Sequence, residues 1–446
     1  MAGYTAGPST FERRGTVTIR PLMGLFLGSA MAAFSSVAWA EDVTVSFLTH
    51  WPPETVAKLE AAAATYAKDH PGVKVEVRAV PFGDLLTTLR SQAGQAGGPT
   101  IAGIYDLWLP ELARDKLVNA APDANATDVK TNWPNGVATA ASVGGTVYGY
   151  PNEIDVYALN YNKKLFEEAG IKEAPKTWDE FVAAAEKLTN KDKGQQGFGM
   201  INSWAAGVVH PFASLLASNG GALVVDGKPQ LDSENAKETF ALYEKLIQSG
   251  ASVATMGTAD ANTTGPFLDN FVSGKTGMII MANWWESALK AGMGDRFADV
   301  ATAPIPVGPK GDGPHSISYS WMTVVSDGAS DAEKKAAWDF LAWFNGPTSG
   351  ENGASAMGDL LQSMGILPSR TSDVAAFADR LKTPFLSGYV DVLSEARPFP
   401  TVLGGQEFTE SLQAQIEALQ FGKTTAAEAA AAAQADAVSI LEKAAQ

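Results

Sequence analysis

Five tryptophans of this chain lie at or just past the ends of predicted strands, next to glycine, serine, asparagine or proline. Sugars present flat C–H faces that stack on aromatic rings and a rim of hydroxyls that bonds to polar side chains. A cleft with several tryptophans and a few charged groups therefore suits a carbohydrate better than an amino acid or a metal ion. The alternative for each ring is core packing, which we expect for Trp178, Trp338 and Trp343 on helical faces. The rings predicted to contact a ligand are Trp51, Trp204, Trp284, Trp285 and Trp321.

Patterns that carry catalysis or hold a metal are missing from the sequence. No Gly-x-Ser-x-Gly elbow occurs, and the four histidines show no His-Glu-x-x-His spacing. Gly274-Lys275-Thr276 imitates the end of a phosphate loop, but Asp269 occupies the position of the required upstream glycine. We therefore predict no catalytic residue, no metal ion and no cofactor. A glycosidase needs only two carboxylates at a set separation in space, so a secreted glycoside hydrolase or lyase stays an alternative.

Predicted strands and helices alternate along the first part of the chain. Strands are expected over residues 43–48, 73–80 and 101–105, and helices over 54–68 and 84–93. This alternation predicts an α/β fold with a parallel or mixed sheet covered on both faces. The ligand loops of such sheets lie at the carboxyl ends of the strands. Here those loops add His50, Tyr105 and Asp106 to the predicted ligand contacts.

A second α/β unit is expected between about residues 156 and 303. It contains a predicted helix over 231–249 and a predicted strand within 271–285. A further strand is expected over 319–326, and capping boxes at Ser330–Glu333 and Thr425–Glu428 each open a helix. A chain of 446 residues is long enough for two sizeable cores, so we expect two domains.

The first forty residues have the pattern of an export signal. A basic start with Arg13, Arg14 and Arg20 precedes an apolar run over 22–37, and Ala38-Trp39-Ala40 is a small-x-small cleavage site. The run is short for a membrane anchor. We predict a signal peptide over 1–40, cleaved after Ala40, with either the general secretory or the twin-arginine route.

The net charge and the absence of cysteine exclude further classes of protein. The formal net charge of −16 disfavours nucleic acid as a partner. The absence of cysteine excludes disulfides, thiolate metal sites and a lipid-modified cysteine anchor. These features predict a free periplasmic protein.

One segment, over 156–188, is similar to a known family: VYALNYNKKLFEEAGIKEAPKTWDEFVAAAEKL. It resembles the signature of the family 1 extracellular solute-binding proteins that serve carbohydrate ABC importers, such as maltodextrin-binding proteins. The order of the GKTGM turn (274–278), the SYSWMTVVS strand and the GILPSR marker (365–370) supports the resemblance over nearly the whole mature chain. Thr100 departs from the pattern, since the family often has Asp there.

The resemblance implies a two-lobed periplasmic binding protein fold, with the ligand cleft between lobes that are joined by crossing hinge segments. On this basis we expect one lobe over 41–151 and 312–364, and the other over 152–311 and 365–446. Asn152, Glu153 and Asp155 lie in the segment where such proteins cross between lobes, and the resemblance implies Asn152 and Asp155 as ligand contacts. Arg397 is a further candidate, which either grips a sugar hydroxyl or pairs with a carboxylate at the surface.

The implied function is that of a periplasmic sugar-binding subunit of an ABC importer. Hinge closure would bury a mono- or oligosaccharide or a polyol, and the closed monomer would dock on the permease at the inner membrane. No chemistry on the ligand is expected. A binding protein for a phosphorylated polyol is a weaker alternative, because the strand-end loops offer almost no basic residues to hold a phosphate.

Overall fold

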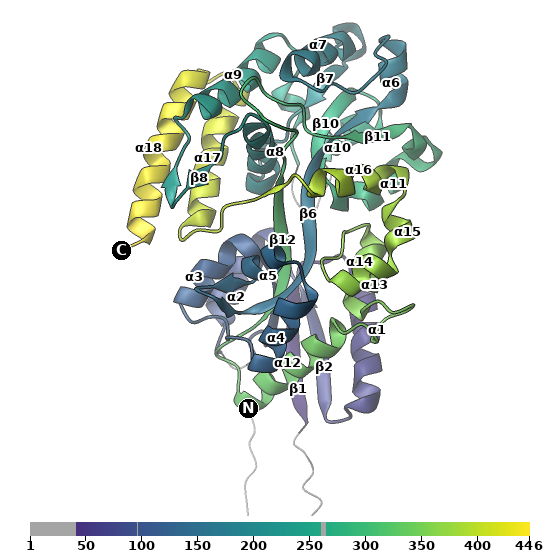
Figure 1. The fold of residues 1–446 in the computed structure, drawn as a ribbon, viewed down its shortest axis with the longest axis vertical. Helices are drawn as coiled ribbons and strands as arrows, with labels where there is room; N and C mark the ends of the chain where they lie inside the picture. The colour runs from purple at the N-terminus through teal and green to yellow at the C-terminus, as the bar shows by residue number, and fades with distance from the viewer. Residues whose placement is uncertain (1–41, 96, 260–264) are drawn as a thin grey trace, which may run out of the picture. The chain divides into compact units, whose positions relative to one another are not determined.

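A long strand, β6 (Gly149–Asn162), connects the two parts of the main sheet. The computed structural model describes residues 42–95, 97–259 and 265–446, so the predicted signal peptide and its cleavage site lie outside the described residues. The first half of β6 pairs antiparallel with β12 (Ile317–Val325), and its second half pairs with β10 (Thr276–Ala282). In Figure 1 β6 and β12 run side by side through the middle of the drawing.

The first part of the sheet is built as the sequence predicted. β1 pairs in parallel with β2 and β3, and β3 pairs antiparallel with β12. β3 is buried along its whole length, whereas β2 alternates between half-buried and exposed residues, as expected of an edge strand. The first three strands are β1 (Val43–Thr49), β2 (Val73–Ala79) and β3 (Ile101–Tyr105). The helices that pack on them are α1 (Pro53–Asp69), α2 (Phe82–Gln92) and α12 (Asp331–Phe344).

The second part of the sheet has its own layer of helices. β10 pairs in parallel with β7 (Gln196–Gly199), and β11 (Val300–Ala303) pairs with the second half of β6. The helices around these strands are α7 (Trp178–Leu188), α8 (Ala205–Ser218), α9 (Glu234–Gln248), α10 (Gly265–Val272) and α16 (Pro384–Leu393). The chain ends in α17 (Gly405–Gln420) and α18 (Ala426–Ala444), which pack on each other and on α8 and α9 (Figure 1).

Shorter elements complete the structure. The helices are α3 (Leu109–Arg114), α4 (Asp123–Asn132), α5 (Asn135–Ala140), α6 (Lys163–Glu168), α11 (Glu286–Met293), α13 (Ala356–Met364), α14 (Thr371–Ala376) and α15 (Ala378–Leu381). The strands are β4 (Ser142–Val143), β5 (Thr146–Val147), β8 (Val224–Val225), β9 (Lys228–Pro229) and β13 (Arg397–Pro398).

Helix caps confirm several predicted boundaries. Both capping boxes, at Ser330 and at Thr425, form with their two reciprocal hydrogen bonds. Thr177 caps α7 by accepting from the backbone N–H of Glu180. The Glu180 carboxylate accepts from the backbone N–H of Lys176 and not from that of Thr177, so Thr177 and Glu180 do not form a capping box.

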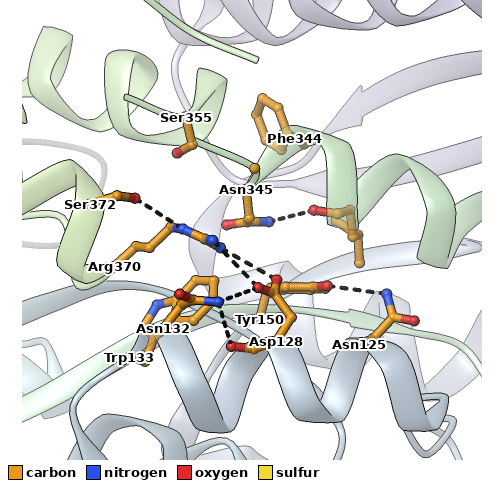
Figure 2. Close-up of polar contacts among 12 residues, drawn as sticks. Asn125, Asp128, Asn132, Trp133, Tyr150, Phe344, Asn345, Ser355, Arg370 and Ser372 are labelled. Carbon is orange, nitrogen blue, oxygen red and sulfur yellow. Dashed lines mark hydrogen bonds and ion pairs between the residues drawn. The ribbon is translucent and has the colours of Figure 1, made fainter. Parts of the chain in front are cut away.

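A buried ion pair ties the segment that precedes α14 to α4 (Figure 2). The Arg370 guanidinium lies 3.3 Å from the Asp128 carboxylate and 4.7 Å from the centre of the Trp133 ring. The neighbouring Ser369 hydroxyl accepts from the Trp133 indole N–H at 3.1 Å and donates to the backbone carbonyl of Pro151 at 2.7 Å. These contacts fix Ser369 and Arg370 against elements of the first part of the sheet.

Candidate ligand-binding site

A cavity of about 580 Å³ collects most of the predicted ligand residues. Its wall combines residues from the ends of β1 and β3, from the middle of β6 and β12, from the start of α8, and from the turn after β10. Three residues at and just after the end of α13 also line it: Ser363, Met364 and Ile366. The predicted residues in the wall are His50, Trp51, Tyr105, Asp155, Trp204, Trp284, Trp285 and Trp321.

Alternation along two paired strands places aromatic and acidic side chains on the same face. In the β6–β12 ladder, Trp321 is opposite Glu153, and Tyr319 is opposite Asp155. Residues two apart on a strand share a face, and directly opposed residues of an antiparallel pair share it too. All four side chains therefore reach the same cavity.

Aromatic rings line the cavity in two packed groups. The Trp204 and Trp284 ring centres are 6.0 Å apart, and those of Trp284 and Trp285 are 5.2 Å apart. On the other side, the His50 ring lies 4.5 Å from that of Trp321. Trp321 is within β12, so the prediction that it follows a strand end was wrong. Trp204 and Trp284 are the half-buried members, which leaves part of their ring area open to a ligand.

Two buried carboxylates form the acidic part of the wall. Burial raises the pKa of Glu153 well above its ordinary value, and the adjacent Asp155 raises it further. Burial also raises the pKa of Asp155 to about 7, against the opposing effect of hydrogen bonds from its neighbours. Asp155 Oδ1 accepts from the Asn283 side chain at 3.0 Å, while its Oδ2 and Glu153 Oε2 have no hydrogen-bond partner among the described residues. Such atoms are ready to bind a polar ligand group.

Hydrogen bonds between aromatic side chains hold the cavity floor. His210 of α8 bonds to the Tyr105 hydroxyl at 2.8 Å through Nε2 and to the Tyr157 hydroxyl at 3.0 Å through Nδ1. The Trp284 indole N–H donates to the Tyr319 hydroxyl at 2.7 Å. Burial lowers the pKa of His210 to about 3, so this ring is neutral at physiological pH. The indole nitrogens of Trp204 and Trp321 are buried without a protein acceptor among the described residues.

Three predicted residues lie outside the cavity wall. Asp106 is buried beside it and accepts from the Ser320 backbone N–H at 2.7 Å. Asn152 is the residue of β6 left unpaired where the register shifts opposite Trp321 and Met322, and its amide donates to Asn345 at 3.1 Å.

The surface interpretation of Arg397 fits its surroundings. Its guanidinium lies 3.6 Å from the exposed Asp312 carboxylate and 3.5 Å from the Gly221 carbonyl. Arg397 therefore pairs with a carboxylate at the surface and does not line the cavity.

Sequence reasoning missed several residues of the wall. Glu153 belongs to the segment over 152–155 where ligand contacts were expected, and it lines the cavity. Tyr319 could have been found, because it lies two residues before the predicted contact Trp321 on the same strand. His210 lies within the apolar helix α8, where a lone histidine gives no signal of its place in the fold. Other residues of the wall that were not predicted include Phe82, Lys58, Glu54, Met364 and Ile366.

The described residues offer no metal site, since no group of three or more His, Asp or Glu side chains could hold an ion. Among the described residues that line the cavity, Lys58 is the only permanently positive side chain, and it is exposed. The wall is therefore aromatic and acidic.

Two α/β layers that share β6, with an aromatic and acidic cavity at their junction, define a two-lobed solute-binding protein. The chain belongs to the bacterial extracellular solute-binding protein family, whose model matches residues 51–351. The predicted fold class is thereby confirmed. Membership in this family also means that the chain is an exported binding protein and not an enzyme.

Individual relatives agree with this family. A binding protein of Brucella abortus (strain 2308) is 24% identical over 424 residues, which cover 93% of this chain and 97% of its own length. The erythritol/L-threitol-binding protein of Mycolicibacterium smegmatis is 25% identical over 309 residues, or 62% of each chain. The GacH receptor of Streptomyces glaucescens, solved unliganded and with acarbose, matches with a TM-score of 0.76 and 24% identity, covering 90% of this chain and 98% of its own. The family is one of sugar-binding ABC transporter subunits. Of the described helices, none is both long and apolar enough to cross a membrane.

Proposed function

We propose that this chain is the periplasmic substrate-binding component of an ABC importer, and that it binds a sugar or polyol in the 580 Å³ cavity. The observation that carries the proposal is the pairing, across the β6–β12 ladder, of Trp321 with Glu153 and of Tyr319 with Asp155. This arrangement sets aromatic rings and hydrogen-bonding carboxylates on one face, as a ligand with flat C–H faces and a rim of hydroxyls requires.

The contacts of the ligand follow from the polar atoms that lack a protein partner. Glu153 Oε2 and Asp155 Oδ2 accept from ligand donors, and the Trp204 and Trp321 indole N–H groups donate to ligand oxygens. The half-buried rings of Trp204 and Trp284 stack on the ligand. Asp106, Asn152 and Arg397 do not line the cavity, and each has one polar group that bonds to a protein atom beside the wall.

Hinge closure is the proposed binding motion. The chain crosses between the lobes in β6, in β12 and near residues 365–377, and these crossings allow the lobes to rotate around a ligand. The contacts of Ser369 and Arg370 with the first lobe favour a lobe boundary after about residue 377, later than the 365 that the resemblance implied. The closed monomer then delivers the ligand to the permease at the inner membrane.

The composition of the wall supports a neutral or cationic ligand over a phosphorylated polyol. A phosphate needs converging basic groups or helix N-termini. Here the only permanently positive side chain among the described lining residues is the exposed Lys58, opposite two buried carboxylates.

Titration of tryptophan fluorescence with a panel of monosaccharides, disaccharides and polyols tests the proposal. We expect saturable quenching or enhancement with at least one member, because several indoles line the cavity. A folded protein that responds to none of them, in fluorescence or in calorimetry, would contradict the proposal. Loss of uptake of the identified ligand on deletion of the gene, restored by the intact chain, tests delivery to a permease.

A further inference from the structure

The two carboxylates of the cavity wall have no basic partner among the residues that the structure describes. Glu153 is 6% exposed and Asp155 is 1% exposed, and no ion pair found among the described residues includes either of them. Asp155 Oδ2 and Glu153 Oε2 also lack hydrogen-bond partners there. A buried carboxylate is stable only if it is protonated or paired with a cation. Without ligand a retained proton meets this requirement, and a cationic ligand group can take the place of that proton.

The surroundings of the pair are those that attract a cation. The rings of Tyr319, Trp321, Trp204 and Trp284 line the same cavity and come from β12, the start of α8 and the turn after β10. Aromatic faces attract positive charge through their quadrupole, and more strongly where water is excluded. An aromatic wall around two carboxylates combines both means of holding an ammonium group.

No other group in the cavity supplies that positive charge. Burial lowers the pKa of His50 to about 4 and that of His210 to about 3, so both rings are neutral at pH 7. Lys58 is exposed and lies on α1 with the exposed Glu54. The nearby Asp106 adds a third buried carboxyl, and the whole chain has a net charge of −16.

We propose that the ligand carries a positively charged amino group, which binds between the carboxylates of Glu153 and Asp155 and is covered by the surrounding aromatic rings. Since this inference rests on the proposed function, the ligand is an amino sugar or an amino polyol. Its hydroxyls and C–H faces use the remaining wall, and its ammonium group supplies the charge that the protein lacks.

Binding of this ligand is coupled to proton release. Without ligand, the pair retains a proton at neutral pH, because burial raises the pKa of both carboxyls. The ammonium group enters with its own protons, the proton of the pair passes to the solvent, and no covalent bond changes. Tyr105, Tyr157 and Tyr319 also face the pair, and burial raises the pKa of each above its ordinary value, so these hydroxyls stay neutral.

Matched ligand pairs test the proposal on the intact mature protein. Isothermal titration calorimetry compares D-glucosamine with D-glucose, and 1-amino-1-deoxyhexitols and amino disaccharides with their hydroxyl counterparts. We expect at least one amino member to bind ten times or more tightly than its partner at pH 6.5, where the amino groups of these ligands are protonated. Its binding heat should vary with the ionisation enthalpy of the buffer, in the direction of proton release.

Charge-neutral variants supply the second measurement. Glu153→Gln and Asp155→Asn should each remove most of the preference for the amino member, whereas Glu173→Gln, on a carboxylate with a 76% exposed side chain, should retain it. Circular dichroism and thermal unfolding check that each variant folds, and the wild-type comparison stands without the variants.

Two outcomes would overturn the proposal in distinguishable ways. If neutral members bind as tightly as their amino partners, the charge inference fails and the proposed function stands. If no member of either kind binds to the folded protein, the proposed function fails, and the inference fails with it.

Discussion

The Tyr105 hydroxyl and the His210 ring are joined by a 2.8 Å hydrogen bond between the end of β3 and helix α8. The two residues are 105 positions apart in the chain and belong to different lobes. His210 is held from the other side by Tyr157 of the shared strand β6, at 3.0 Å. Because this bond joins residues assigned to different lobes, the proposed opening of the hinge would break it.

Removing this hydrogen bond should weaken ligand binding without unfolding the protein. Tyr105→Phe keeps the ring and deletes the hydroxyl, and a hydrogen bond of this kind contributes about 0.5–1.5 kcal/mol. We expect a 2- to 10-fold rise in Kd by calorimetry. Tyr148→Phe, the same change on a tyrosine outside the cavity wall, should leave Kd unchanged. Equal Kd values for the two variants would contradict a role of this bond in closure.

Truncating a half-buried ring of the wall should cost affinity. Trp284→Ala removes a stacking surface and the donor to the Tyr319 hydroxyl. Stacking contributes about 0.5–1.5 kcal/mol beyond the buried area. The lost apolar contact area adds to this at about 25 cal/mol per Å², so we expect at least a tenfold rise in Kd. Trp343→Ala, on a half-buried tryptophan that packs against Tyr66, should affect thermal stability and not Kd. A Trp284→Ala protein with wild-type affinity would show that this ring does not touch the ligand.

The buried carboxyl of Asp106 makes stability depend on pH. Burial raises its pKa to about 8, whereas an unfolded aspartate titrates near 4, so the folded state holds an extra proton between these values. Stability therefore falls as pH rises from about 4 to about 8. Asp106→Asn keeps an oxygen that can accept from the Ser320 N–H, and removes the ionisation.

Denaturant unfolding at pH 5 and pH 8 measures this effect. We compare the free energy of unfolding of Asp106→Asn with that of wild type at each pH. This difference should be more favourable to the variant at pH 8 than at pH 5, by on the order of 1–3 kcal/mol. Asp379→Asn, on a fully exposed carboxylate, should follow the wild-type pH dependence. If the free energies of unfolding of wild type and Asp106→Asn differ by the same amount at both pH values, Asp106 does not have the raised pKa.

The buried Arg370–Asp128 pair should matter for stability and not for binding (Figure 2). Arg370→Met leaves Asp128 without its cation and removes the contact with the Trp133 ring. Breaking a buried pair is costly, and the 29% exposure of Asp128 moderates the loss to about 2–3 kcal/mol. Lys382→Met breaks an exposed pair with Asp379 and should cost less than about 0.5 kcal/mol. Similar unfolding midpoints for the two variants would contradict the prediction.

Local patterns in the sequence predicted the elements well, because period and capping are local properties. The expected helix over 54–68 is α1, the strand over 101–105 is β3, and the boxes at Ser330 and Thr425 form as expected. The two-lobed arrangement came from the resemblance, since no periodicity reveals that β6 serves both parts of the sheet. The signal peptide and the lobe boundaries stay predictions.

The site was harder to predict where it depends on long-range packing. The predicted strand ends led to His50, Trp51 and Tyr105, which line the cavity. This worked because ligand loops gather at one edge of such a sheet. Alternation from Asp155 places Glu153 on the cavity face, but nothing in the sequence marks the register shift at Asn152. His210 reaches the site only because α8 packs on the shared strand.

The close approach of Gly103 to the Trp321 ring leads to a last prediction. A Cβ added at Gly103 of β3 would lie 2.8 Å from Trp321 Nε1, which is closer than a van der Waals contact. The ring is 4% exposed and packed against His50, so it cannot move aside freely. Gly103→Ala should therefore displace the ring into the cavity, lower stability by about 1–3 kcal/mol and raise Kd at least several-fold. Gly136→Ala, on helix α5 where a methyl meets no atom within 4 Å, should leave Kd unchanged and stabilise slightly. A Gly103→Ala protein that binds like wild type would show that the Trp321 ring can retreat without cost to the site.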